Sequence, residues 1–441
     1  MELSGKHVIV VGLGKSGIAA ARLCVERGAK VTGTDSAPRD KLSRELDSLD
    51  IEVVAGTHQG VRFDRSDLVV VSPGVPALAE LEVASEAGAE VIGELELASR
   101  FLDEMPLVVI GGTNGKSTTT TLVGELLSAA GRKVFTGGNL GTPACAAVGE
   151  EWDAVVYEVS SFQLERAPTL KPRVSVLLNV TEDHLDRYPS FQAYAEAKGN
   201  AFVNQNHDDC AIVPFGDVIC EEQARRGQGR LISFGEAGDY PLEGTTVVEN
   251  TSGERYELGG SRLHGRHNHG NAAAAVAAAR CLDVGPASIR LGLGRFEPLG
   301  HRMALVAELK GVRYYDDSKG TNVGAAVTAL TGLLEERAVL IAGGRDKQGS
   351  YEPLVAALKQ KARAVVVIGE AAERIRAAIK DELPVHVAVS MDEAVRQAAL
   401  LAKPGDAVLL SPACSSFDMF KSYAERGDRF AEAVRSLKGA P

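Results

Sequence analysis

Residues 107–120, LVVIGGTNGKSTTT, constrain the fold more than any other stretch of the sequence. An apolar run typical of a buried strand leads through a glycine-rich loop into a segment expected to be helical from Lys116 to about Ala130. In such a loop, backbone N–H groups surround phosphate oxygens, the lysine contacts the terminal phosphates and the serine hydroxyl binds Mg²⁺. The common motif has another glycine five residues before Gly115, where this chain has Ile110. The stretch therefore predicts a nucleoside triphosphate site in a shorter loop than usual.

Short apolar runs alternate with helical stretches along all 441 residues, which predicts parallel sheets with helical crossovers. Breaks near Met105-Pro106 and in RFEPLGHR (295–302) divide the chain. We expect three α/β domains over residues 1–101, 102–300 and 301–441. Within the second, the turn-rich stretch 230–262 is expected to form an added small sheet, and the alanine-rich stretch 268–282 a closely packed helix.

The bulk composition excludes several classes of protein. There are 48 basic and 59 acidic residues, a net charge of −11, which argues against a general nucleic-acid binder. The six cysteines form no C-x-x-C pair, so zinc-ribbon and thioredoxin-like interpretations fail. No apolar run approaches the ~20 residues that span a membrane, and the N-terminus lacks a signal-peptide pattern. We expect a cytoplasmic protein without a membrane partner, and a monomer.

A second glycine loop, Gly12–Gly17, follows the apolar run HVIVV and fits the pattern G-x-G-x-x-G. Asp35 ends the next strand, near the offset at which an acid binds a ribose in NAD-binding folds. The same loop could hold any nucleotide diphosphate, including a UDP-sugar, or serve only as a tight packing turn. Ser72-Pro73-Gly74 follows a further apolar strand and should lie on the same sheet edge.

Three more polar residues stand at informative positions. Glu158 ends the strand AVVYEV and is the natural oxygen ligand for Mg²⁺, the alternative being a solvent-facing acid. His184 follows the strand VSVLLNV, where parallel sheets place ligand-binding loops. Lys198 lies in QAYAEAK, a predicted helix, and the pattern alone indicates a surface lysine.

The order of the motifs identifies a family. The chain contains, in sequence, GTNGKST, GGNLG (137–141), EVSSFQLE (158–165), NVTEDHLDRY (179–188), GRHNHGNAAAA (265–275), HR (301–302), DDSKGTN (316–322) and SPACSSFDMF (411–420). Over essentially its whole length the chain resembles the Mur ligase family. The resemblance implies a Rossmann-like N-terminal domain for a UDP-linked substrate, a P-loop ATPase-like central domain for ATP and a Rossmann-like C-terminal domain for an amino acid. The compact N-terminal unit and the HLDRY and SPACSSFD forms most resemble the members that join D-glutamate to UDP-N-acetylmuramoyl-L-alanine.

The resemblance also assigns site residues. For ATP it implies Gly112, Thr113, Asn114, Gly115, Lys116, Ser117, Thr118, Asn268, Asn271, Arg302 and Asp317. For the UDP substrate it implies Lys15, Ser16, Asp35, Ser72, Gly74, Asn139 and His184, and for D-glutamate Thr321, Lys347, Ser416, Phe417 and Tyr423.

The implied reaction passes through an acyl phosphate and a tetrahedral intermediate to an amide, ADP and phosphate, in cytoplasmic peptidoglycan precursor synthesis. The implied catalytic residues are Lys116, Glu158, His184 and Lys198. Two Mg²⁺ ions are expected on Ser117, Glu158 and His184, and on Lys198 if CO₂ converts it to a carbamate.

Other functions remain open on the sequence. The nearest alternative is a ligase of the same family that adds a different amino acid or a dipeptide. A folate polyglutamylating relative is disfavoured by the G-x-G-x-x-G unit, and diamino-acid-adding members by the absence of DNPR or DDDR. From other classes, the chain could be an NAD-dependent oxidoreductase or a nucleotide-gated binding protein without catalysis.

Overall fold

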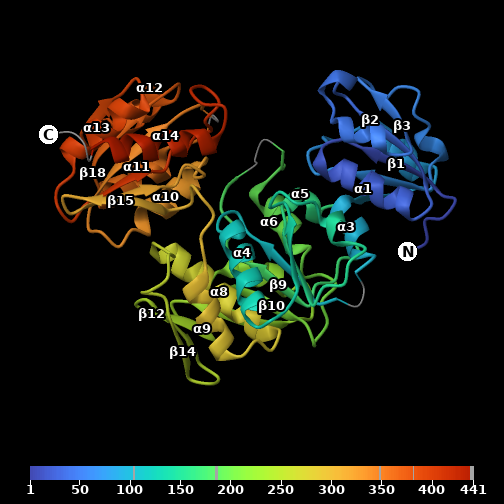
Figure 1. Ribbon diagram of the computed structural model, residues 1–441, viewed down its shortest axis with the longest axis horizontal. Helices are drawn as coiled ribbons and strands as arrows, with labels where there is room; N and C mark the ends of the chain where they lie inside the picture. Colours follow the sequence, from blue (N-terminus) through green and yellow to red (C-terminus); the bar gives the residue numbers. More distant parts are fainter. Residues whose placement is uncertain (103–104, 184–186, 347–348, 381, 438–441) are drawn as a thin grey trace.

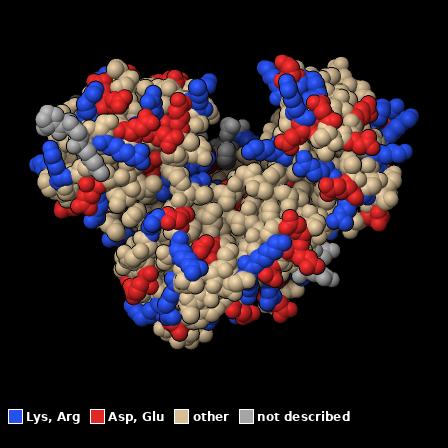
Figure 2. All heavy atoms as spheres, in the orientation of Figure 1, with Lys and Arg blue, Asp and Glu red and all other residues tan. Residues whose placement is uncertain are grey.

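The computed structural model describes residues 1–102, 105–183, 187–346, 349–380 and 382–437. Three α/β lobes follow one another along the chain, with the central lobe between and below the other two (Figure 1). In the space-filling view the N-terminal and C-terminal lobes flank an open cleft above the central lobe (Figure 2). Acidic and basic side chains are mixed over this face of the molecule (Figure 2).

The N-terminal lobe contains a five-stranded parallel sheet in the order β3-β2-β1-β4-β5. Its elements are β1 (His7–Val11), α1 (Lys15–Glu26), β2 (Lys30–Asp35), β3 (Ile51–Ala55), β4 (Leu68–Val71), α2 (Ala79–Glu86), β5 (Glu90–Gly93) and α3 (Glu94–Ser99). Strands β1 and β4 are buried along nearly their whole length, as expected for parallel strands covered on both faces. The strand order reverses beside β1, so ligands should bind beyond the carboxyl end of this strand.

The central lobe is built on a nine-stranded sheet in the order β14-β13-β12-β11-β10-β9-β6-β8-β7. Its strands are β6 (Leu107–Gly111), β7 (Val134–Gly138), β8 (Ala154–Glu158), β9 (Val174–Leu177), β10 (Cys210–Pro214), β11 (Arg230–Gly235), β12 (Tyr240–Glu243), β13 (Thr246–Glu249) and β14 (Glu254–Glu257). Its helices are α4 (Lys116–Ala129), α5 (Ser161–Leu164), α6 (Phe191–Gly199), α7 (Val218–Ala224), α8 (Arg266–Cys281) and α9 (Pro286–Arg295). Every residue from Ala272 to Ala279 is buried, since small side chains let α8 lie close to the sheet and to α4.

The C-terminal lobe contains a six-stranded sheet in the order β15-β16-β20-β17-β18-β19, parallel except for β15. Its strands are β15 (Ala304–Leu309), β16 (Val312–Asp316), β17 (Ala338–Gly343), β18 (Ala362–Ile368), β19 (Val385–Val387) and β20 (Ala407–Leu410). Its helices are α10 (Val323–Thr331), α11 (Glu352–Lys361), α12 (Ala372–Ile379), α13 (Met391–Leu401) and α14 (Tyr423–Ser436). Apolar clusters cover both faces of the sheet.

The three-lobe α/β architecture confirms the predicted fold class, while the exact domain boundaries stay a prediction. The stretch 230–262 does not form a separate sheet, because β11 pairs with β10 and β12 with β11, which extends the central sheet. Strands β5, β7 and β15 and helix α9 were not predicted. Each is short or low in apolar periodicity. β5 pairs with β4, β7 with β8 and β15 with the adjacent strand β16, while α9 packs on α4.

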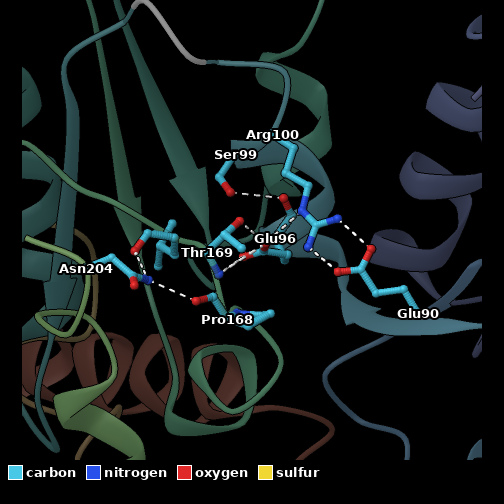
Figure 3. Close-up of polar contacts among 8 residues, drawn as sticks. Glu90, Glu96, Ser99, Arg100, Pro168, Thr169 and Asn204 are labelled. Carbon is cyan, nitrogen blue, oxygen red and sulfur yellow. Dashed lines mark hydrogen bonds and ion pairs between the residues drawn. The ribbon is translucent and has the colours of Figure 1, made fainter. Parts of the chain in front are cut away.

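Helix α3 joins the N-terminal and central lobes through buried polar contacts (Figure 3). Glu96 is fully buried and accepts hydrogen bonds from the backbone N–H and hydroxyl of Thr169 and from Arg100 Nε at 2.7 Å. The Arg100 guanidinium also binds both carboxylate oxygens of Glu90, at 2.7 and 2.5 Å. These contacts fix the N-terminal sheet against a loop of the central lobe.

Candidate functional site

The nucleotide loop lies between β6 and α4, as predicted. Gly112 (φ +137°) and Gly115 (φ +86°) adopt backbone conformations that favour glycine. A Cβ atom on Gly115 would lie 2.4 Å from Asn271 Oδ1, so the α8 amide packs directly on the loop. Lys116 Nζ donates to the carbonyls of Gly112 (3.0 Å) and Thr113 (2.7 Å), which folds the side chain back over the loop.

The carboxylate of Glu158 connects the loop to the next strand end. Ser117 Oγ donates to Glu158 Oε2, and Asn139 Nδ2 donates to Glu158 Oε1 at 2.7 Å. From the C-terminal lobe, Arg302 Nη2 donates to Ser117 Oγ at 2.7 Å. Glu158 is only 3% exposed, so the alternative of a solvent-facing acid is wrong. The buried Glu158 carboxylate thus contacts Ser117 and Asn139, and Arg302 of the C-terminal lobe contacts the same serine.

Burial sets the charge state of the lysines around this carboxylate. It lowers the pKa of Lys116, although the Glu158 and Asp183 carboxylates act in the opposite direction. It lowers the pKa of Lys198 further, and the neighbouring Lys116 charge adds to that shift. Lys198 is 3% exposed, and its Nζ donates to the Gly112 carbonyl at 2.8 Å and lies 4.6 Å from the centre of the Tyr194 ring. The surface position indicated by the pattern of its helix is therefore wrong.

A cavity of about 520 Å³ opens beside the nucleotide loop. Seven of the residues assigned to ATP line it: Asn114, Gly115, Thr118, Asn268 and Asn271 from the central lobe, and Arg302 and Asp317 from the C-terminal lobe. Burial raises the pKa of Asp317 to about 7, and its Oδ2 accepts from Ser411 Oγ at 2.7 Å. Phe215, Phe234 and Lys319 also line this cavity and were not predicted. Phe215 and Phe234 follow or end apolar strands, a position that could have indicated them.

Other residues assigned to ATP belong to the nucleotide loop itself and to the start of α4. Thr113 N–H donates to the Asn179 carbonyl at 3.0 Å, and Asn114 N–H to Asn179 Oδ1 at 2.9 Å. Ser117 lies at the start of α4, where N–H groups and the helix dipole favour an anion. The geometry of the loop is that of a phosphate-binding turn.

A second cavity, of about 610 Å³, lies between the N-terminal and central lobes. It brings together all the described residues assigned to the UDP substrate: Lys15, Ser16, Asp35, Ser72, Gly74 and Asn139. His58 and Gln163 line it too and were missed. His58 lies between Gly56 and Gly60 in the loop after β3, a position that could have indicated it, whereas Gln163 lies within α5. His58 Nδ1 lies 2.9 Å from the hydroxyl of Thr34.

The three glycines of the first loop have different roles. A Cβ on Gly12 would lie 2.6 Å from Val75, and one on Gly17 only 1.8 Å from the Gly12 carbonyl oxygen. A Cβ on Gly14 would meet no atom within 4 Å, and Gly14 lines the cavity. Gly12 and Gly17 therefore serve packing, whereas Gly14 keeps the backbone open to a ligand.

Both carboxylate oxygens of Asp35 accept hydrogen bonds from backbone N–H groups of the protein. Its Oδ2 accepts from the Leu13 N–H at 2.6 Å and its Oδ1 from the Ala37 N–H at 2.8 Å. Ser72 Oγ likewise donates to the Gly12 carbonyl at 2.7 Å. Both side chains border the cavity while they hold its backbone wall.

Of the described residues assigned to D-glutamate, Thr321 lies on the loop after β16, and Ser416 and Phe417 lie on the loop after β20, at the carboxyl edge of the C-terminal sheet. The two loops are joined by a hydrogen bond of 2.9 Å from the Ala413 N–H to the Gly320 carbonyl. Ser416 is buried, Phe417 is exposed and Tyr423 begins α14. Thr321, Ser416, Phe417 and Tyr423 line neither of the two cavities above. The structure places them at one sheet edge without gathering them into a pocket with the nucleotide loop.

Two predicted site residues, His184 and Lys347, lie outside the described residues. Asp183, next to the first of these, accepts from Asn322 Nδ2 at 3.3 Å. Among the residues that the structure describes, no three His, Cys, Asp or Glu side chains form a metal cluster. No helix in the described part of the chain is long and apolar enough to cross a bilayer.

The donor set beside the loop fits Mg²⁺. The Ser117 hydroxyl and the Glu158 carboxylate are in contact and supply hard oxygen ligands, which Mg²⁺ combines with phosphate oxygens and water. Lys198 also fits a carbamate, because its lowered pKa favours the neutral amine that reacts with CO₂.

Comparisons with known proteins agree with this geometry. Three family models match in order: a Mur ligase MurD-like N-terminal domain over residues 6–93, a Mur ligase middle domain over 110–279 and a Mur ligase glutamate ligase domain over 301–414. A relative from Trichlorobacter lovleyi is 47% identical over 99% of this chain and 100% of its own length. Another, from Geotalea daltonii, is 44% identical over 100% of this chain and 99% of its own. Both are named UDP-N-acetylmuramoylalanine–D-glutamate ligase.

Solved structures share the fold at low sequence identity. MurF ligase from Thermotoga maritima, in complex with ADP, matches with a TM-score of 0.63 at 20% identity, over 100% of this chain and 97% of that one. A pseudomurein peptide ligase type C from Methanothermus fervidus matches with a TM-score of 0.62 at 18% identity, over 98% and 100%. With three domain models in order and relatives this similar over their full length, this chain belongs to the Mur ligase family.

Proposed function

We propose that this chain is an ATP-dependent ligase that adds D-glutamate to UDP-N-acetylmuramoyl-L-alanine, releasing ADP and phosphate. One observation carries the proposal furthest. Asn139 lines the cavity between the first two lobes and hydrogen-bonds Glu158, which in turn accepts from Ser117 of the nucleotide loop. The Glu158 carboxylate thus links a residue that lines the second cavity to the nucleotide loop, and the substrate carboxylate approaches the terminal phosphate of ATP beside it.

The reaction begins when the alanyl carboxylate oxygen attacks the γ-phosphorus of ATP, and the bond from that phosphorus to the bridging oxygen of ADP breaks. The D-glutamate amine then attacks the acyl carbon. The tetrahedral intermediate collapses to the amide and expels inorganic phosphate, while the amine loses a proton. Activation is needed because a carboxylate is a poor acylating group.

The main barrier is repulsion between a carboxylate and a triphosphate. Lys116 and Arg302 are both well placed to reduce it, since Lys116 Nζ lies over the nucleotide loop and Arg302 donates to Ser117 of that loop. Preorganised cations at this position stabilise the charge that develops on the transferred phosphate. Lys116 holds the β- and γ-phosphates, and Arg302 reaches the loop from the C-terminal lobe.

Mg²⁺ bound by Ser117 and Glu158 would neutralise phosphate charge and orient the γ-phosphate. A second ion, with His184 among its ligands, belongs to the same proposal, as does a carbamate on Lys198. Lys198 contacts the Gly112 carbonyl, so an anionic group on its nitrogen would lie beside the phosphate loop.

D-glutamate binds at the carboxyl edge of the C-terminal sheet, through Thr321, Lys347, Ser416, Phe417 and Tyr423. Closure of the C-terminal lobe brings this edge to the acyl phosphate and protects that intermediate from water. We place the reaction in the cytoplasm, carried out by a monomer with small-molecule partners.

The test is phosphate release from ATP and Mg²⁺ in the presence of UDP-N-acetylmuramoyl-L-alanine. D-glutamate is compared with L-glutamate, glycine, L-alanine and L-lysine, and the amide product is identified by mass spectrometry. Release and product only with D-glutamate support the proposal. Release with another amino acid keeps the mechanism and overturns the substrate, while a change in nicotinamide absorbance without phosphate release points to an oxidoreductase.

Lys116→Ala tests the ATP site in the same assay. It removes the charge at the phosphates while leaving the helix former that α4 requires. We expect product formation to disappear and the circular dichroism spectrum to remain. Normal turnover would remove the ATP assignment.

Lys198→Ala tests the carbamate. We expect activity to fall by roughly a hundredfold or more, as for loss of one electrostatic group in a shielded site, and to recover in part with added acetate or formate. Full activity without added carboxylate would contradict the carbamate.

A further inference from the structure

Two cysteines that the proposed reaction does not use meet on the opposite side of the central lobe. Cys210 begins β10 and Cys281 ends α8, so they come from distant parts of the sequence. Cys281 packs against the apolar cluster that contains Cys210, and each thiol shifts the pKa of the other. The carboxyl end of β10, at Pro214, lines the nucleotide cavity, and Cys210 therefore lies at the other edge of the sheet.

The surroundings favour a thiolate on one of the two sulfurs. Arg230 Nη2 donates a hydrogen bond of 3.5 Å to Cys210 Sγ. The Cys281 thiol, this arginine and the charge of Arg173 lower the pKa of Cys210 in spite of its burial. The pKa of Cys281 is raised, so this sulfur keeps the proton. A thiolate beside a protonated thiol is the pairing that thiol oxidation requires.

Small molecules can reach the pair. Cys281 is half-buried and lines a cavity of about 480 Å³ whose cationic residues include Arg132, Lys171 and Arg173. Asp209 also borders the cavity and lies 3.6 Å from Arg173. Cys281 borders the cavity and Cys210 is buried, so an uncharged oxidant the size of hydrogen peroxide would approach the pair from the side of Cys281.

The remaining cysteines lack this environment. Burial raises the pKa of Cys24, Cys145, Cys220 and Cys414, which keeps each of them in the unreactive thiol form. The contrast within one chain makes site-selective oxidation testable.

We propose that Cys210 and Cys281 form a peroxide-sensitive modification site that closes to a disulfide. The Cys210 thiolate attacks one oxygen of hydrogen peroxide, the O–O bond breaks, and Cys210 becomes a sulfenic acid while hydroxide leaves and is protonated to water. The Cys281 sulfur then attacks the Cys210 sulfur and forms the S–S bond. The Cys281 proton and the sulfenic hydroxyl leave together as a second water. Sulfur is oxidised and peroxide is reduced, so no further reactant is needed.

The experiment treats the purified full-length protein with hydrogen peroxide at several pH values and maps the peptides without reduction. We expect a peptide pair linked through Cys210 and Cys281 that dithiothreitol separates. The linking rate should fall as the pH is lowered, by up to roughly tenfold for each pH unit, because the thiolate fraction falls. A raised thermal midpoint should accompany the link, because a bridge between distant residues restricts the unfolded chain. Absence of the linked peptide, or a sulfenic acid that persists on Cys210 in the wild type, overturns the proposal.

Three variants separate the roles. Cys281→Ser should leave a sulfenic acid on Cys210 that dimedone traps, and the absence of that adduct would overturn Cys210 as the attacking sulfur. Arg230→Gln should slow linking several-fold at neutral pH, and an unchanged rate would overturn thiolate stabilisation by this arginine. Cys220→Ser is the matched control, a buried cysteine in the same lobe, and should form the link as the wild type does.

Discussion

The two joints of the molecule are built in different ways. At the first, between the N-terminal and central lobes, one apolar cluster contains residues of both, including Leu95 and Leu97 of α3 and Tyr157, Leu164 and Leu170 of the central lobe. At the second, the apolar clusters of the central and C-terminal lobes are separate. The first joint is therefore held by a shared core, which removes apolar area from water whether or not a ligand is bound.

The second joint depends on polar contacts near the nucleotide cavity. Arg302 donates to Ser117, Asn322 donates to Asp183, and the Arg266 N–H donates to the Gly332 carbonyl at 2.8 Å. Such contacts exchange readily with water and contribute about 1 kcal/mol each. The comparison indicates that the C-terminal lobe can change its position when substrates bind, whereas the N-terminal lobe keeps its place on the central lobe.

The largest expected effect on stability is at the first joint. Glu96→Ala should lower the free energy of unfolding by about 3–5 kcal/mol, because it leaves Arg100 and the Thr169 N–H without their buried partner (Figure 3). Urea unfolding measures the loss. Glu382→Ala, which removes an exposed ion pair with Lys359, should change stability by about 1 kcal/mol or less. Equal losses in the two variants would contradict a first joint that depends on buried contacts.

At the second joint the expected loss is in catalysis. Arg302→Ala should reduce kcat/KM by roughly 10²–10³-fold, as for removal of one electrostatic donor, with little change in unfolding. Steady-state phosphate release and urea unfolding measure the two quantities. Arg295→Ala, an exposed arginine at the end of α9, should behave as the wild type. An Arg302→Ala variant that is less stable but fully active would show that this contact serves stability and not catalysis, contrary to the proposed difference between the two joints.

The contribution of the first joint to stability should depend on pH. Glu94 is buried between lobes, its Oε1 accepts from the Cys145 N–H at 2.7 Å, its Oε2 has no partner, and burial raises its pKa to about 7. The folded state therefore binds a proton that the unfolded chain releases near pH 4.5. The stabilising contribution of the protonated acid is complete below that pH and is lost as pH rises through 7.

Glu94→Gln should remove this dependence. Between about pH 5 and pH 8 the wild type should lose about 2 kcal/mol more stability than the variant, as unfolding at each pH would measure. Glu86→Gln, on the exposed face of α2, should follow the wild type. Parallel stability curves for wild type and Glu94→Gln would exclude Glu94 as a buried acid that titrates on unfolding.

The smallest effect is expected from Asn322→Asp. Aspartate preserves the N-cap that Asn322 provides to the Ala325 N–H, but it cannot donate to Asp183 and repels it. Stability should change by less than about 1 kcal/mol, while KM for ATP should rise about two- to threefold. Titration of ATP in the release assay measures this change, and an unchanged KM would remove this contact from lobe positioning.

The sequence predicted the parts of the site that follow from strand ends and glycine turns. Gly112 to Ser117, Glu158, Lys15 and Ser72 all lie where the carboxyl edges of parallel strands place them. It did not predict the burial of Lys198, because that depends on a hydrogen bond to Gly112, far away along the chain. The Cys210–Cys281 contact was missed for the same reason, since cysteine spacing detects only local pairs. How near the residues assigned to D-glutamate come to the nucleotide loop depends on how the lobes are placed, which local patterns do not determine.

The shared core of the first joint also affects synthesis on the ribosome. One face of the N-terminal sheet is covered by residues 9–91 alone, but the other packs against residues as late as Leu170 and Ala201. Helix α1 covers part of this second face, but the rest of its apolar surface stays uncovered until about half of the central lobe has emerged, and exposed apolar surface during folding favours aggregation. The C-terminal lobe, whose clusters begin at Met303, needs no such delay. During synthesis the N-terminal core is therefore completed only together with the central lobe, whereas the C-terminal lobe completes its core from its own residues.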